Sequence, residues 1–150
     1  MNLQEELKAL KKRIAELEEL AKEEQDFPQE DDVFCFINTF GKPVESTWGE
    51  SITNRQLIEI GNMFRTKEQA EFAVEKLKVE AELRKFSRKF IWGGENWILS
   101  MGTNKDIFLV YEDDEMNQGA VYFEDEYKAL EAIEAVGKER IKKYIFGVEE

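Results

Sequence analysis

The fold is decided by residues 64–77, which read FRTKEQAEFAVEKL. Phe64 suits a strand, and Thr66 is able to cap a helix with its hydroxyl while Gln69 reaches back in a capping box. Apolar residues then recur with helical spacing, so we predict a short strand at 58–64 followed by a helix from 67 to about 88. The predicted apolar face of this helix comprises Phe72, Val74, Leu77, Ala81, Leu83 and Phe86, with Ala70 and Ala73 small enough to approach a sheet.

A similar stretch, FEDEYKALEAIEAV, occurs 59 residues later at 123–136. The matched pairs are Phe64 and Phe123, Thr66 and Asp125, Ala70 and Ala129, Ala73 and Ala132, Val74 and Ile133, and Leu77 and Val136. Each unit is predicted to be a small meander of strands followed by a capped helix. Two interpretations stay open, a duplicated unit or the ordinary chemistry of a strand that leads into a helix.

The remaining elements make the expected fold class α+β, with antiparallel strands. Residues rich in β-branched and aromatic side chains predict strands at 33–38, from 43 towards Trp48, and at 96–101, 106–112 and 120–123. Gly49 and Asn54 are assigned to a loop. A closing helix is expected from Asp125, and Gly137 is expected to divide it.

An N-terminal helix is predicted from Leu3 to Glu24, because leucines alternate at spacings of four and three, as at the a and d positions of a coiled coil. Glu6 and Arg13 at g would face Lys11 and Glu18 at e of a parallel partner, and both pairs attract. We therefore expect a homodimer through this helix. The predicted dimerisation residues are Leu3, Leu7, Leu10, Ile14 and Leu17. Three heptads are few for a self-standing coiled coil, and the alternative is a helix folded back on its own domain.

The chain is expected to divide into three parts. Residues 1–25 form the N-terminal helix, residues 26–32 form an acidic linker around Pro28, and residues 33–150 form an α+β body.

Composition excludes several kinds of protein. The net charge of −12 repels phosphate backbones, so direct nucleic-acid binding is not expected, and a basic protein groove is the natural complement of such a surface. The single cysteine, Cys35, excludes an intrachain disulfide, and the absence of histidine removes the common nucleophile-activating pairs and histidine metal sites. We expect no enzyme activity, no cofactor and no metal. No run of residues is apolar enough for a membrane span, so a cytoplasmic protein is expected.

Carboxylates cluster in two places, which are the predicted partner-binding residues: Glu112, Asp113, Asp114 and Glu115, and Glu124, Asp125 and Glu126. Three interpretations stay open. The clusters are solvated turns with favourable charge at a helix N-terminus, or they imitate the phosphates of a nucleic acid, or they hold Mg²⁺.

Residues 60–86, IGNMFRTKEQAEFAVEKLKVEAELRKF, and 132–150, AIEAVGKERIKKYIFGVEE, resemble a group of small proteins carried by phages and prophages of Gram-positive bacteria. The resemblance implies a phage setting and no catalytic residue. By analogy it implies an inhibitor of host defence, such as an anti-CRISPR protein acting on a nuclease. A dimeric phage scaffold or a DNA-metabolism accessory protein is the alternative.

Overall fold

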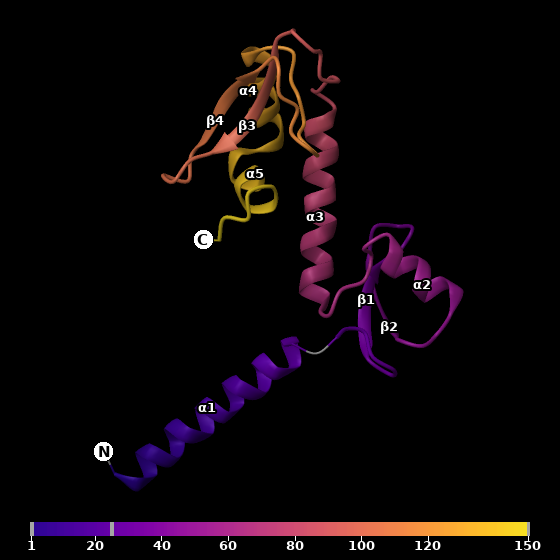
Figure 1. Cartoon of the computed structure of the whole chain (residues 1–150), viewed down its shortest axis with the longest axis vertical. Coiled ribbons are helices and arrows are strands. Elements are labelled where there is room, and N and C mark those ends of the chain that lie inside the picture. The colour runs from indigo at the N-terminus through magenta and orange to yellow at the C-terminus, as the bar shows by residue number, and fades with distance from the viewer. Residues whose placement is uncertain (1, 25, 150) are drawn as a thin grey trace.

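The structure is a computed structural model that describes residues 2–24 and 26–149. It has the expected α+β architecture, with antiparallel strands (Figure 1). The elements are α1 (Leu3–Glu24), β1 (Val33–Ile37), β2 (Pro43–Thr47), α2 (Ile52–Glu59), α3 (Lys67–Arg84), β3 (Asn96–Met101), β4 (Ile107–Glu112), α4 (Glu126–Val136) and α5 (Lys138–Tyr144).

Helix α3 is the central element and connects two lobes (Figure 1). Its contacts with β1 and β2 form the N-lobe, which also contains α2. Its contacts with α4 and α5, together with the β3–β4 hairpin, form the C-lobe. One helix therefore contributes side chains to both lobes.

The N-lobe is built on the hairpin β1–β2, in which Val33 lies opposite Thr47. Phe64 extends this hairpin by one residue pair, because its backbone N–H and C=O both bond to Cys35 at 2.8 Å. Phe34 and Ala70 are fully buried here, and Cys35 is buried beside them.

The C-lobe has the larger core. Its hairpin β3–β4 places Trp97 opposite Tyr111, and Phe123 pairs with the other edge of Trp97 through bonds of 3.0 and 2.9 Å. The buried core residues are Val79, Leu83, Phe123, Ala129, Ala132, Val136 and Ile141. Gly137, at φ 103°, separates α4 from α5 as predicted, in a conformation that disfavours any residue with a Cβ.

The predicted strand at 58–64 is wrong. Residues 52–59 form α2, because the Ser51 hydroxyl accepts a hydrogen bond from the Asn54 N–H at 3.0 Å and caps the helix. Asn54 is consequently helical rather than part of a loop, and only Phe64 pairs with a strand. The predicted strand at 120–123 is likewise reduced to single pairings of Tyr122 and Phe123.

Helix α3 is shorter than predicted and has two buried faces instead of one. It ends at Arg84, because the chain then turns and the Arg88 N–H bonds to the Tyr122 carbonyl at 2.9 Å. Phe72 and Leu77 are 40% and 53% exposed, and Ala81 is exposed, while Val79, which was not predicted, is fully buried. A single apolar stripe could not account for a helix that serves two lobes on different sides.

Helix α1 has the predicted bounds and extends away from the body (Figure 1). Near its end, the Arg65 guanidinium donates to the Lys22 carbonyl at 3.2 Å and lies 4.7 Å from the centre of the Phe27 ring. Within the described ranges, no helix is both long and apolar enough to cross a membrane.

Candidate functional site

The two predicted carboxylate clusters lie at one end of the C-lobe. Asn96, the first residue of β3, is opposite Glu112 on one side, and its neighbour Trp97 pairs with Phe123 on the other. Glu124 follows Phe123 directly. The two acidic segments therefore start about two strand spacings apart, roughly 10 Å.

Two of the seven predicted residues have structural roles. The Glu112 carboxylate accepts hydrogen bonds from the Asn117 amide at 2.6 Å and the Tyr122 hydroxyl at 3.5 Å. The Asp125 carboxylate accepts from the Lys128 N–H at 2.7 Å and is the N-cap of α4. These two carboxylates stabilise the C-lobe, and their hydrogen bonds are made within the chain.

The other five form an exposed group, which we call the acidic end: Asp113, Asp114, Glu115, Glu124 and Glu126. Over residues 2–24 and 26–149, none of these five side chains makes a hydrogen bond or an ion pair. Of the cations on adjoining segments, Lys128 pairs with Glu131 at 3.4 Å and Arg88 donates to Asn96 at 3.0 Å, whereas Lys89 is exposed and lines a groove together with Met116. Among the described residues, no lysine or arginine therefore forms an ion pair with the acidic end.

One carboxylate at this end was missed in the sequence. Glu95 directly precedes β3 and accepts a hydrogen bond from the Trp97 indole N–H at 3.1 Å. It stands alone in sequence beside a Gly-Gly turn, so no clustering indicated it. The pairing of Asn96 with Glu112 is what brings it to the acidic end.

The acidic end has the chemistry of a surface that attracts cations or basic proteins, because its carboxylates are exposed to solvent. In the part of the chain that the structure describes, no group of three or more Asp, Glu or Cys residues is arranged to hold a metal ion.

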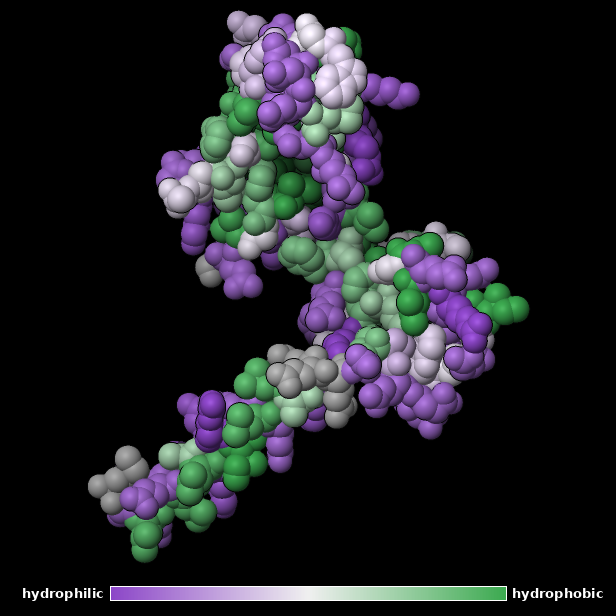
Figure 2. Space-filling view, in the orientation of Figure 1, coloured by the Kyte–Doolittle hydropathy of each residue, from purple (hydrophilic) through white to green (hydrophobic). Residues whose placement is uncertain are grey.

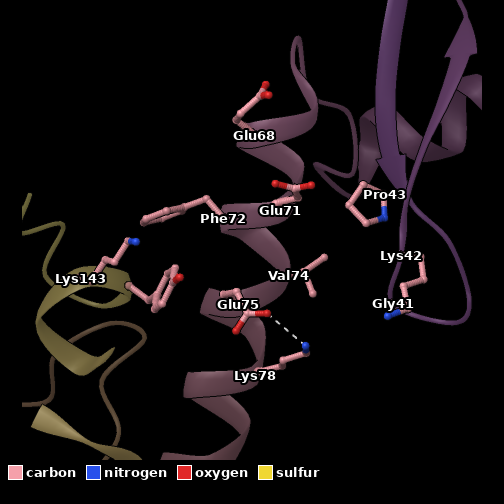
Figure 3. Close-up of a pocket in the computed structure, with 11 residues that line it drawn as sticks. Gly41, Lys42, Pro43, Glu68, Glu71, Phe72, Val74, Glu75, Lys78 and Lys143 are labelled. Carbon is pink, nitrogen blue, oxygen red and sulfur yellow. Dashed lines mark hydrogen bonds and ion pairs between the residues drawn. The ribbon is translucent and has the colours of Figure 1, made fainter. Parts of the chain in front are cut away.

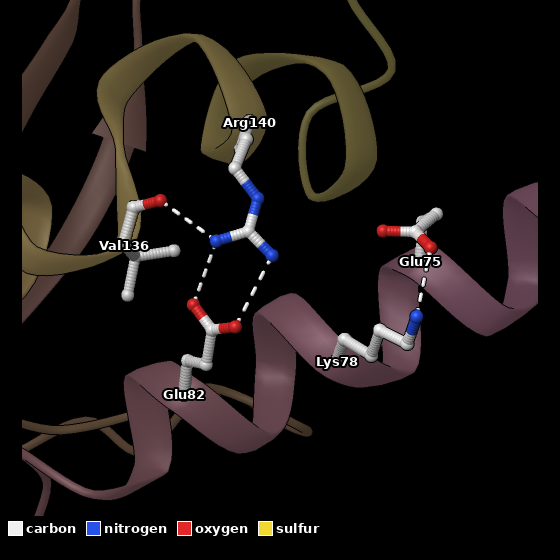
Figure 4. A network of polar contacts seen from close by, with 5 residues as sticks. All are labelled: Glu75, Lys78, Glu82, Val136 and Arg140. Carbon is white, nitrogen blue, oxygen red and sulfur yellow. Dashed lines mark hydrogen bonds and ion pairs between the residues drawn. The ribbon is translucent and has the colours of Figure 1, made fainter.

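The C-lobe that carries the acidic end is closed by an ion pair between α3 and α5 (Figure 4). The Arg140 guanidinium donates to both Glu82 carboxylate oxygens, at 2.7 and 3.2 Å, and to the Val136 carbonyl at 2.9 Å. Hydrogen bonding to Arg140 lowers the pKa of Glu82, against a smaller opposing effect of burial. This pair connects the central helix to the C-terminal helix.

The predicted dimerisation residues form an exposed apolar seam along α1 (Figure 2). Their exposed fractions range from 48% for Leu17 to 83% for Leu3. Leu20, which was not predicted because it falls at a g position, is also 50% exposed. Of the flanking charges, Arg13 pairs with Glu16 at 3.4 Å, whereas the side chains of Glu6, Lys11 and Glu18 form no hydrogen bond or ion pair with any described residue.

A groove of about 430 Å³ lies between the β1–β2 turn, α3 and the end of α5 (Figure 3). Phe72 and Tyr144 meet there with ring centres 5.0 Å apart, and Lys78 pairs with Glu75 at 3.1 Å on the rim. Its residues come from three distant segments, so periodicity within one segment could not reveal it. Three lysines and three glutamates line it, so it favours neither sign of ligand: Lys42, Lys78, Lys143, Glu68, Glu71 and Glu75.

Comparison with protein-family models, curated proteins and solved structures found no match to this chain.

Proposed function

We propose that this chain is a non-catalytic binding protein whose acidic end occupies a basic groove of a host protein, where a nucleic acid would otherwise lie. The observation that carries the proposal is the acidic end itself, five exposed carboxylates at one end of a well-packed lobe that form no hydrogen bond or ion pair with any described side chain. Potentials of opposite sign across an interface speed association and select the partner. A groove that neutralises phosphates would attract such a surface for the same reason.

The setting that we propose is a phage accessory protein in the cytoplasm of a bacterial host, where it inhibits a defence protein. A CRISPR nuclease is the first candidate, because such enzymes hold the guide–target heteroduplex in a positively charged channel. The resemblance of residues 60–86 and 132–150 to phage-borne proteins is the support for this setting.

We further propose that the protein acts as a homodimer through α1. The seam of α1 leaves large aliphatic side chains half or more exposed, which is unfavourable in water unless they are covered. A dimer presents two acidic ends, and two linked sites bind a two-site target more tightly than one.

The test compares two variants with the same change in net charge. In the first, Asp113→Asn, Asp114→Asn and Glu115→Gln remove three charges of the acidic end. In the matched control, Glu30→Gln, Glu45→Gln and Glu59→Gln remove three exposed N-lobe charges. The readout is DNA cleavage by the purified CRISPR nuclease of a susceptible host, with binding measured at increasing salt.

We expect the first variant to lose inhibition and the control to retain it, and we expect wild-type binding to weaken steeply with salt. Equal inhibition by the first variant and wild type would remove the acidic end from the mechanism. Mg²⁺-dependent turnover of a nucleic acid by the purified chain would overturn the non-catalytic proposal.

The exposed seam also favours a second function, that of a dimeric phage scaffold or DNA-metabolism accessory protein. Burial of the seam requires no host protein and depends little on salt. Self-assembly that is insensitive to salt, without any effect on a host nuclease, would favour this second function.

A further inference from the structure

The two lobes contain the same structural unit. In each, a hairpin is extended by a single paired residue, Phe64 in the N-lobe and Phe123 in the C-lobe. Two residues later a side chain caps the next helix, and these caps are Thr66 for α3 and Asp125 for α4. The matches seen 59 residues apart in the sequence therefore occupy corresponding places in the fold.

Corresponding residues are not equally buried. Ala70 and its counterpart Ala129 are both fully buried. Three pairs are more buried in the C-lobe, because Phe123, Ala132 and Val136 are at most 3% exposed, whereas Phe64 and Ala73 are only half-buried and Leu77 is 53% exposed. The pair of Val74 and Ile133 differs the other way, with Val74 buried and Ile133 half-buried. The side of the N-lobe unit that carries Phe64, Ala73 and Leu77 is therefore less covered by other elements than the corresponding side of the C-lobe unit.

The missing cover is a helix. In the C-lobe, Phe123, Ala132 and Val136 pack in one cluster with Val79 and Leu83 of α3, which is the helix that precedes the hairpin, and with Ile141 of α5. In the N-lobe, the corresponding place is a groove of about 460 Å³. Its apolar lining includes Ile37, Ile60, Phe64, Ala73 and Leu77.

The helix that precedes the N-lobe hairpin is α1, and its seam has the required spacing. Val79 and Leu83 of α3 cover the C-lobe and are four residues apart, and Phe86, just after the end of α3, packs against the same cluster. In α1, Leu10 and Ile14 are likewise four residues apart, and both are exposed, as is Leu17. A partly apolar groove and an exposed apolar helix seam thus occur in one chain.

We infer that the groove of the N-lobe is filled by α1 of a second copy, and that two copies exchange these helices reciprocally. The inference rests on the proposed dimerisation through α1 and specifies what the seam binds. The helix of the same chain points away from its own body (Figure 1), and near its end the Lys22 carbonyl accepts a hydrogen bond from the Arg65 guanidinium at 3.2 Å. Reciprocal exchange gives a closed dimer with two equivalent contacts.

The first test measures the dimer dissociation constant of the full chain by sedimentation equilibrium. Leu10→Lys changes the seam and Leu77→Lys changes the groove. Leu130→Lys is the matched control, because Leu130 is also 53% exposed but lies on α4, away from the groove. We expect both Leu10→Lys and Leu77→Lys to raise the dissociation constant about tenfold or more, and Leu130→Lys to leave it unchanged.

The outcomes separate this inference from the proposed dimer. A dimer that is weakened by Leu10→Lys but not by Leu77→Lys pairs seam to seam, which overturns helix exchange and keeps dimerisation through α1. A wild-type chain that is monomeric at every concentration overturns both. Circular dichroism of Leu77→Lys distinguishes a lost contact from a lost fold.

A second test uses disulfide formation between separately purified variants. Chains carrying Leu10→Cys, Ile14→Cys or Leu17→Cys are each mixed with chains carrying Leu77→Cys, and at least one mixture is expected to give a covalent heterodimer. Cys35 is buried and stays out of the reaction. Covalent homodimers of the α1 variants alone would overturn helix exchange in favour of a coiled coil. In a chain that carries both an α1 cysteine and Leu77→Cys, a disulfide formed within that one chain would show that its own α1 fills the groove. That result would overturn the inference that a second copy fills it.

Discussion

The guanidinium of Arg140 and the carboxylate of Glu82 form a two-bonded ion pair, at 2.7 and 3.2 Å, across 58 residues of sequence. This pair joins the central helix α3 to α5, next to the core cluster of the C-lobe. Both side chains are more than one-third exposed, so water and salt screen much of their attraction. The pair therefore contributes modestly to stability but is well suited to a pH test.

Glu82→Gln is expected to lower the free energy of unfolding at pH 7 by about 0.5–1 kcal/mol, after allowance for screening. Because Arg140 lowers the pKa of Glu82 in the folded state, this contribution is present above the ordinary value of about 4.3 and is lost as the pH falls further through the folded pKa. Urea unfolding at pH 7 and pH 3 checks it, with the exposed Glu134→Gln as a control. An equal deficit at both pH values would contradict the assignment.

Phe123 and its counterpart Phe64 are unequally buried, so replacing each by alanine is expected to lower the free energy of unfolding by different amounts. Phe123→Ala removes a fully buried ring and is expected to cost about 3–5 kcal/mol. Phe64→Ala removes its half-buried counterpart and is expected to cost about half as much, measured by urea unfolding of the monomer. If the two costs were equal, the N-lobe groove would already be filled within the single chain.

The division of the acidic residues into structural and exposed members predicts different effects of neighbouring substitutions. Asp125→Ala removes the N-cap of α4 and is expected to cost about 1 kcal/mol of stability. Glu124→Ala changes an exposed side chain and is expected to stay within about 0.5 kcal/mol of wild type. Thermal unfolding of both variants is the measurement. A larger loss for Glu124→Ala would show that the acidic end also has a structural role.

Cys35 is expected to react with thiol reagents only when the protein unfolds. Burial is the main cause that raises the pKa of its thiol, and the nearby Glu45 carboxylate raises it further. In the folded state the reagent therefore cannot easily reach the sulfur, and little of the thiol is present as the reactive thiolate. Labelling at pH 8 in increasing urea should follow the unfolding transition. Thr103→Cys, in the exposed turn between β3 and β4, is the control that should react at once. Fast labelling of folded wild type would place Cys35 in an open site.

Local patterns in the sequence were enough to predict α1, the two hairpins and the position of both helix caps. These features depend on residues close together in the chain, such as the leucine spacing of α1 and Thr66 three residues before Gln69. The strand predicted at 58–64 failed for a similar reason, because Ile58 and Ile60 have strand propensity while the nearby Ser51 cap and Gly61 define a short helix. Local competition of this kind is decided by small differences in energy.

For the candidate site, clustering in the sequence identified the acidic residues but could not separate their roles. Asp113 and Glu112 are neighbours in sequence, yet only Glu112 turns towards Asn117 and Tyr122. Glu95 joins the same end only because β3 pairs with β4. The groove beside Leu77 was hidden altogether, because it is formed from β1, the segment after α2 and one side of α3.

The sequence by itself determined the α+β class, the helical arm with its leucine seam, and the excess of carboxylates with their two clusters in the C-terminal part, because composition and short-range periodicity specify these. The tertiary structure decided that α3 serves two lobes, which carboxylates remain unpaired, and which surface of the N-lobe stays uncovered. Burial and pairing depend on which distant segments pack together, and that depends on the free energy of the whole fold rather than on any one segment.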